Sequence, residues 1–147
     1  MSGFDFRYIE QLLVALILTS LTVVIHGIGM NWVRRYFMRA WSLAKGHPRS
    51  GSHLMVMVGI VAITMVTHFA EVIIWALFYV LRGLIPHWLS AVYFSIASYT
   101  TLGESGITLP AHWQGLGGFE AMAAMLMFGW STAMLAAVIL KVQSLDT

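Results

Sequence analysis

The chain alternates between long apolar runs and short polar connections, and three of the runs are long enough to cross a membrane. They cover residues 11–30, 54–81 and 116–142. A helix rises about 1.5 Å per residue, so about 20 apolar residues span the roughly 30 Å of hydrocarbon in a bilayer. The pattern therefore predicts an all-α membrane protein with three transmembrane helices.

A fourth apolar segment, residues 87–100, is aromatic and too short to span. It follows Pro86, a residue suited to the first turn of a helix, and it stops at Thr100-Thr101-Leu102-Gly103. About 13 helical residues reach only about 20 Å. Irregular backbone at membrane depth is tolerated only where protein buries it or where it lines a water-filled path. This layout predicts a re-entrant pore helix followed by a filter loop.

These elements divide the chain into two parts. Residues 1–53 are expected to form an N-terminal transmembrane helix and a basic cytoplasmic interfacial segment, with residues 31–45 turning along the inner interface as a separate helix. Residues 54–147 are expected to form a pore domain. Its elements are an outer helix at 54–82, a pore helix at 87–100, a filter at 100–106 and an inner helix at 115–142.

Charge is scarce and unevenly placed. Only 10% of the residues are charged, against about 25% in soluble domains. Five of the eight basic residues cluster without an intervening acid: Arg34, Arg35, Arg39, Lys45 and Arg49. The positive-inside rule then places the 34–53 connection and the C-terminus in the cytoplasm and the N-terminus outside. The expected location is a bacterial inner membrane, with anionic lipids at Arg34–Arg49 and no nucleic acid bound.

The order of a membrane helix, a short aromatic helix ending in Thr-Thr-Leu-Gly and a small-residue-rich helix resembles the pore module of the potassium-channel superfamily. From Trp75-Ala-Leu-Phe-Tyr79 to Phe128-Gly-Trp-Ser-Thr132, the chain is similar to small bacterial two-transmembrane ion-channel proteins with an extra leading helix. The resemblance covers residues 54–142. It implies a homotetramer around a central pore. The implied filter residues are Thr100, Thr101, Leu102, Gly103, Glu104, Ser105 and Gly106.

The filter sequence departs from the family pattern Thr-x-Gly-(Tyr or Phe)-Gly-Asp. Thr101-Leu102-Gly103 matches it, and Glu104-Ser105-Gly106 then stands where Tyr-Gly-Asp is expected. Glu104-Ser105 also resembles the Glu-Ser of bacterial sodium-channel filters. Gly103 can adopt positive φ freely, whereas Ser105 in a left-handed conformation would cost about 1–2 kcal/mol. We therefore expect the outer half of the carbonyl stack to be lost or reshaped.

A four-chain assembly would place Glu104 four times at the outer mouth, where a carboxylate ring attracts cations and can bind a divalent ion. The expected function is a weakly selective or non-potassium cation channel that passes Na⁺, K⁺ or Ca²⁺, without enzymatic activity or a resident cofactor. Alternatively, Glu104 faces away from the axis and pairs behind the filter. The other functional alternatives are a potassium-selective channel with a reshaped filter, a non-conducting subunit, and a metal- or proton-binding membrane protein.

Three polar residues lie inside the predicted spans, where ionisable groups call for a functional interpretation. His68 and Glu71 are three residues apart and share one helix face, and His26 lies near the inner end of the first span. They could form a hydrogen-bonded lock between helices, a pH sensor or proton relay, or a metal site. A membrane-embedded enzyme using these residues with Glu104 is the rival hypothesis, but the chain has no HExxH motif and no cysteine.

Two positions in the last span are candidates for support or gating. Glu120 is expected to support the filter from behind by accepting bonds from pore-loop amides, or alternatively to line the vestibule. Gly129 is expected to mark a close helix crossing or a gating hinge, since glycine costs roughly 1 kcal/mol in a helix interior relative to alanine. Trp88, Tyr93, Phe94 and Tyr99 are expected to wedge the short helix in place.

Overall fold

The computed structural model describes residues 6–44 and 50–143, and the regular structure within these ranges is entirely helical. Three segments, Tyr8–Ala40, Leu54–Leu81 and Ala111–Gln143, are long and apolar enough to cross a membrane. The all-α class and the three candidate spans are therefore confirmed. The elements are α1 (Phe6–Ala44), α2 (Ser50–Leu81), α3 (Trp88–Tyr99), the 3₁₀ turn η1 (Ala111–Trp113) and α4 (Leu116–Gln143).

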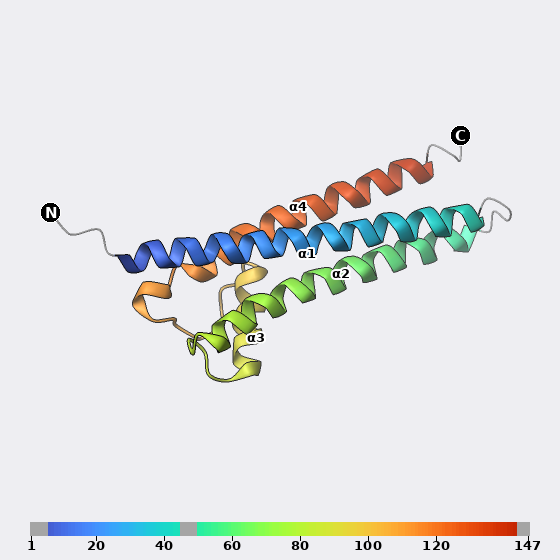
Figure 1. The fold of residues 1–147 in the computed structure, drawn as a ribbon. Helices are drawn as coiled ribbons and strands as arrows, with labels where there is room; N and C mark the ends of the chain where they lie inside the picture. Colours follow the sequence, from blue (N-terminus) through green and yellow to red (C-terminus); the bar gives the residue numbers. More distant parts are fainter. Residues whose placement is uncertain (1–5, 45–49, 144–147) are drawn as a thin grey trace.

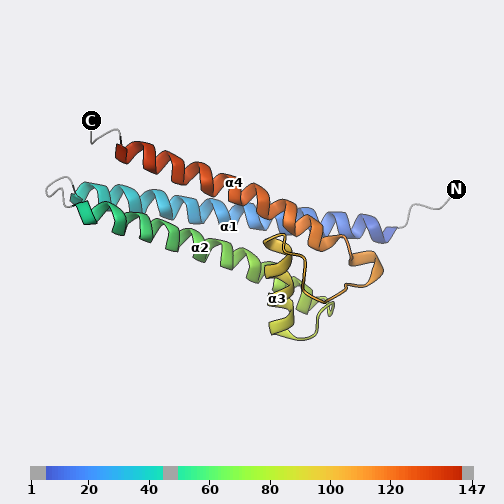
Figure 2. The same cartoon turned by 180° about the vertical axis from the view of Figure 1, so that it is seen from behind.

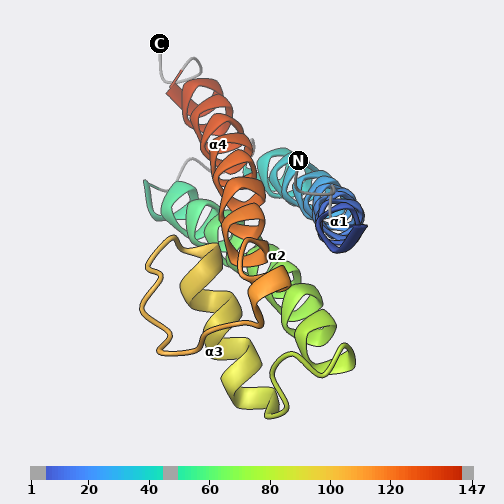
Figure 3. The same cartoon turned by 90° about the vertical axis from the view of Figure 1, so that its left-hand side faces the viewer.

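The three long helices lie side by side, with α1 and α4 running in one direction and α2 in the other (Figures 1 and 2). The short α3 packs on α2 and α4, and α1 packs on the same two helices from the opposite side (Figure 3). The carboxyl ends of α1 and α4 lie at one end of the molecule, and α3 lies towards the other. The basic end of α1 and the loop after α3 are thus well separated along the bundle.

The first helix differs from the expectation, because α1 continues without a break through residues 31–44, where a separate helix was expected. These residues contain no glycine or proline, and their apolar positions still have partners. Val33 and Phe37 are buried in a cluster with Ile60 of α2 and Val138 of α4. Core packing therefore extends α1 beyond its apolar run. Arg34, Arg35 and Arg39 are exposed, whereas Lys45 and Arg49 lie outside the described residues.

A glycine at positive φ ends α2 where the sequence predicts a break. Gly83 has φ 66°, and the N–H groups of Gly83 and Leu84 donate to the carbonyls of Val80 and Tyr79, both at 2.9 Å. This pair of bonds satisfies carbonyls that the last helical turn would otherwise leave unpaired. The chain then turns through Pro86 into α3.

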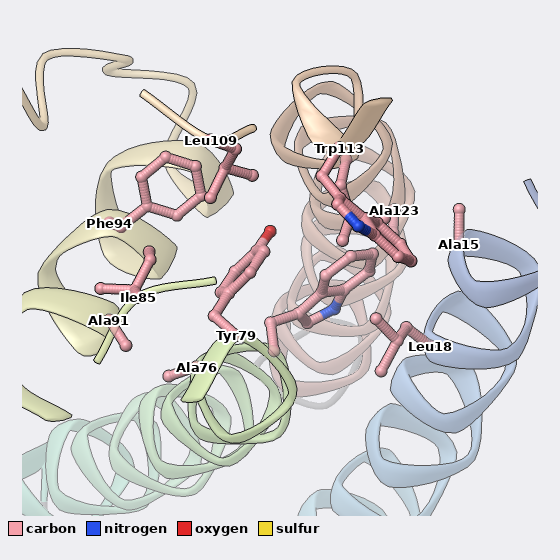
Figure 4. Close-up of a cluster of buried hydrophobic side chains, with 12 residues drawn as sticks. Ala15, Leu18, Ala76, Tyr79, Ile85, Ala91, Phe94, Leu109, Trp113 and Ala123 are labelled. Carbon is pink, nitrogen blue, oxygen red and sulfur yellow. The ribbon is translucent and has the colours of Figure 1, made fainter. Parts of the chain in front are cut away.

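An apolar cluster holds α3 against the long helices (Figure 4). The Tyr79 ring of α2 packs edge-to-face on Phe94 of α3, with centroids 5.0 Å apart. Beside it, the Trp75 indole donates a hydrogen bond of 3.0 Å to Thr22 of α1. An edge-to-face pair such as Tyr79 and Phe94 adds about 0.5–1.5 kcal/mol of stability beyond the contribution of the apolar area it buries. The cluster therefore fixes the position of the short helix and the loop that follows it.

The closest glycine-mediated approach lies between α1 and α2. A Cβ added at Gly29 would lie 2.1 Å from Oγ1 of Thr67, so any larger residue would push the two helices apart. A Cβ added at Gly129 would meet no atom of the described chain within 4 Å. The close crossing expected at Gly129 is therefore not found within one chain, and its alternative role as a hinge stays a prediction.

Candidate functional site

The loop after α3 adopts left-handed conformations at alternate positions. Thr101 has φ 61° and Gly103 has φ 74°. A threonine at positive φ is strained, and such strain concentrates at functional sites. Gly103 behaves as the sequence predicts. Ser105, in contrast, avoids positive φ, and Gly106 takes it instead, with φ 66°. The backbone strain that the sequence predicts for Ser105 is therefore absent there, and the non-glycine residue at positive φ in this loop is Thr101.

The loop is anchored at both ends and exposed in its middle. Tyr99 and Leu109 are buried, whereas Thr101 to Glu104 are exposed. The Tyr93 hydroxyl donates to the backbone carbonyl of Glu104 at 3.4 Å, and the side chain of Glu104 is exposed. The middle of the loop is thus exposed, together with the Glu104 carboxylate, while the Gly103 carbonyl accepts a 3.0 Å hydrogen bond from the Ser105 N–H.

Glu120 lies behind α3 and is fully buried. Its carboxyl group accepts a 2.8 Å hydrogen bond from the Tyr79 hydroxyl of α2 and lies 2.5 Å from the Ser95 hydroxyl of α3. The Ser95 hydroxyl is also 2.9 Å from the carbonyl oxygen of Val72. These partners are hydroxyls of helices rather than the loop amides that the sequence analysis expected. Glu120 therefore positions α3, and its burial leaves it no place in a vestibule of its own chain.

A closed ring of polar side chains joins all four α-helices next to the end of α3. We call His26, His68, Glu71, Tyr99 and Ser131 the five-residue ring. The five side chains belong to buried residues. Glu71 is hydrogen-bonded to His26 Nδ1 at 2.9 Å and to the Tyr99 hydroxyl. The Tyr99 hydroxyl lies 2.8 Å from His68 Nδ1.

The Ser131 hydroxyl of α4 completes the ring. It lies 3.2 Å from His68 Nε2 and 3.3 Å from His26 Nε2. The rings of Phe128 and Trp130 cover the two imidazoles, with centroid distances of 4.8 and 5.2 Å respectively. The ring is therefore closed by direct contacts and shielded by aromatic groups.

The structure brings together the three polar span residues that the sequence singled out. One ligand atom from each of His26, His68 and Glu71 lies within 4.8 Å of the others. The sequence predicted only a packing role for Tyr99, as part of the aromatic wedge, and assigned no site role to Ser131. Their contacts join residues 28 to 105 positions apart, beyond the reach of any helical spacing rule. The residue types gave no specific signal, because the same two segments contain other hydroxyls, such as those of Ser95 and Thr132.

Comparisons of the chain with protein-family models, with curated proteins and with solved structures found no match. The observations support a helical protein with three long apolar helices and identify no family for it. Inference about function therefore depends on the loop, on Glu120 and on the five-residue ring.

The two parts of the site offer different chemistry. Carbonyl and carboxylate oxygens of the loop are ligands suited to hard cations such as Na⁺, K⁺ and Ca²⁺. The five-residue ring offers imidazole nitrogens, a carboxyl group and two hydroxyls, each already engaged with a neighbour. Tyr99 connects the two parts, since it is the last residue of α3 and directly precedes the loop.

Proposed function

We propose that this protein is the subunit of a homotetrameric cation channel, weakly selective or non-potassium, whose filter is the loop at residues 100–106. One observation carries the proposal. In a chain of membrane-length helices, a half-length helix leads into a non-helical loop with positive φ at Thr101 and Gly103 and an exposed middle. The resemblance of residues 54–142 to the potassium-channel pore module supports it.

The backbone of the loop explains why a pore fits this geometry. Left-handed residues at alternate positions turn successive carbonyl oxygens towards one side, and a stack of such oxygens can replace the water shell of a cation. Polar backbone at membrane depth must face protein or water. If several copies assemble around a water-filled axis, the exposed backbone of Thr101 to Glu104 faces water or neighbouring copies rather than lipid.

The proposed selectivity follows from Glu104. In four copies its exposed carboxylate forms a ring at the mouth of the pore, where the resembled family has an aromatic residue. Carboxylates draw in cations while tolerating partial hydration, so they discriminate less by ion size than a full stack of carbonyls. We therefore propose passage of Na⁺, K⁺ and Ca²⁺.

The proposed orientation follows from the two ends of the bundle. Arg34, Arg35 and Arg39 are exposed near the carboxyl end of α1, far along the bundle from α3. Basic residues at a membrane boundary favour the cytoplasmic side and anionic lipids. The loop after α3 would then open to the outside of the inner membrane, and the carboxyl end of α4 would face the cytoplasm.

A single-cysteine variant tests the proposed assembly, because the chain has no native cysteine. We expect Glu104→Cys to form disulfide-linked dimers on mild oxidation within an assembly of about four 16.4 kDa chains. We also expect a cationic thiol reagent to block its ion flux in proteoliposomes. Ser20→Cys is the matched control, since Ser20 is exposed on α1, which packs on the side of the bundle opposite α3. A monomeric Glu104→Cys protein without cross-links would contradict the proposal.

A further inference from the structure

The five-residue ring contains five polar contacts, and each contact needs one proton between its two heavy atoms. The contacts run from Glu71 to Tyr99, to His68, to Ser131, to His26 and back to Glu71. Two lone pairs that face each other without a proton cannot form a hydrogen bond, and a buried unpaired polar group is costly. A ring in which all five contacts are hydrogen bonds therefore holds five protons.

The usual protonation states leave the ring one proton short. Tyrosine and serine each supply one O–H, a neutral histidine supplies one N–H, and an ionised carboxylate supplies none. With Glu71 ionised and both imidazoles neutral, only four protons are available for the five contacts. A fifth proton closes the ring, whether it resides on Glu71 or on the second nitrogen of either histidine. This count is the same for every tautomer and for either direction of the hydrogen bonds.

The charge around the ring gives the same answer. Glu71 faces His26 and His68 from α1 and α2, and Tyr99 from α3. From α4 the ring meets uncharged Ser131, and the ionisable group of α4 that acts electrostatically on Tyr99 is the acid Glu120. With the fifth proton the ring is neutral, and without it the ring carries one negative charge. An uncompensated charge inside a membrane span is unfavourable.

We propose that the five-residue ring is a proton-binding site that takes up one proton per chain when the protein folds. The proton closes the set of hydrogen bonds that joins α1, α2, α3 and α4. Loss of the proton at high pH leaves one of the five contacts without a hydrogen bond, and so loosens the ring to which Tyr99 belongs, the residue directly before the proposed filter. Only an effect of this loosening on the filter rests on the proposed channel function; proton uptake does not.

Removal of the Ser131 hydroxyl separates this proposal from a purely structural role. Ser131→Ala removes two contacts and one proton from the ring. Three contacts remain, from His26 to Glu71, from Glu71 to Tyr99 and from Tyr99 to His68. With Glu71 ionised, the single protons of His26, Tyr99 and His68 are enough to make all three into hydrogen bonds. The variant therefore needs no extra proton. Ser131→Thr keeps the hydroxyl, and Thr132→Ala is the matched control, because the Thr132 hydroxyl donates to the Phe128 carbonyl of its own helix at 2.8 Å.

The experiment follows detergent-induced unfolding of the purified protein between pH 7 and pH 9, with tryptophan fluorescence as the signal. Histidine in an unfolded chain is mostly neutral above about pH 7, so the native state then binds one more proton than the unfolded state. Stability falls with pH wherever the native state binds more protons. We expect the unfolding constant of the natural chain to rise by up to about tenfold per pH unit for each chain, relative to Ser131→Ala.

Ser131→Thr and Thr132→Ala are expected to retain the steep dependence on pH. Should Ser131→Ala fail to fold, Glu71→Gln replaces it, since an amide N–H supplies the missing proton to the same ring. Equal pH dependence of the natural chain and the Ser131→Ala or Glu71→Gln chain would overturn the proposal. Elemental analysis showing one metal ion per chain, lost in Glu71→Gln, would overturn it in favour of a metal site at His26, His68 and Glu71. Neither readout requires ion conduction.

Discussion

A Glu71→Ala chain is expected to lose about 3–5 kcal/mol of its free energy of unfolding, the range found when one partner of a buried ion pair is removed. The substitution removes the carboxyl group that is hydrogen-bonded to both His26 and Tyr99. These two buried side chains are then left without that partner. Each buried polar group left unpaired costs about 1–3 kcal/mol. Unfolding in mixed micelles, followed by tryptophan fluorescence, measures the loss.

Two other substitutions serve as controls for Glu71→Ala. Glu10 forms an exposed ion pair with Arg82, so Glu10→Ala is expected to change the unfolding free energy by about 1 kcal/mol or less. Glu71→Gln is expected to retain most of the stability, because the amide can accept from His26 and donate to Tyr99. A Glu71→Ala chain as stable as Glu10→Ala would show that the five-residue ring does not hold the helices together.

Glu104→Gln is expected to weaken block of monovalent current by external Ca²⁺ by at least tenfold. In the proposed tetramer this change neutralises four carboxylates at one constriction while preserving their size. Tenfold corresponds to about 1.4 kcal/mol, a modest share of the attraction between a divalent ion and several carboxylates at close range. Dose–response curves for Ca²⁺ block, recorded in planar bilayers from the natural and variant proteins, measure the change.

Glu10→Gln is the control for Glu104→Gln, since Glu10 is an exposed acid near the start of α1, outside the loop. Glu10→Gln is expected to leave the Ca²⁺ concentration needed for block unchanged. An identical curve for Glu104→Gln would mean that Glu104 does not face the pore. The alternative, pairing of Glu104 behind the filter, would then be favoured.

The helices α2 and α3 could be predicted closely from the sequence, because each begins or ends at a local signal. Gly83 stops α2, and Pro86 precedes α3, so the expected bounds at 54–82 and 87–100 lie within a few residues of Ser50–Leu81 and Trp88–Tyr99. The continuation of α1 could not be predicted this way. It depends on Val33 and Phe37 meeting side chains of α2 and α4, which no local pattern encodes.

The candidate site was predictable in its ionisable members and not in their partners. His26, His68 and Glu71 are conspicuous in apolar spans, and the structure brings them together. Tyr99 and Ser131 resemble ordinary packing residues until the fold sets them against the imidazoles. Glu120 likewise was expected to accept hydrogen bonds from backbone amides, yet its partners are the hydroxyls of Tyr79 and Ser95 on neighbouring helices. Contacts between distant elements decide these pairings, and hydrophobic periodicity contains no information about them.

The most direct measurement of the proposed function is the reversal potential of the purified protein in a planar bilayer, with KCl on one side and NaCl on the other. The proposal predicts a cation current with chloride excluded, and a reversal potential near zero because K⁺ and Na⁺ pass with similar ease. No current above that of protein-free bilayers, or a current carried by chloride, would contradict it.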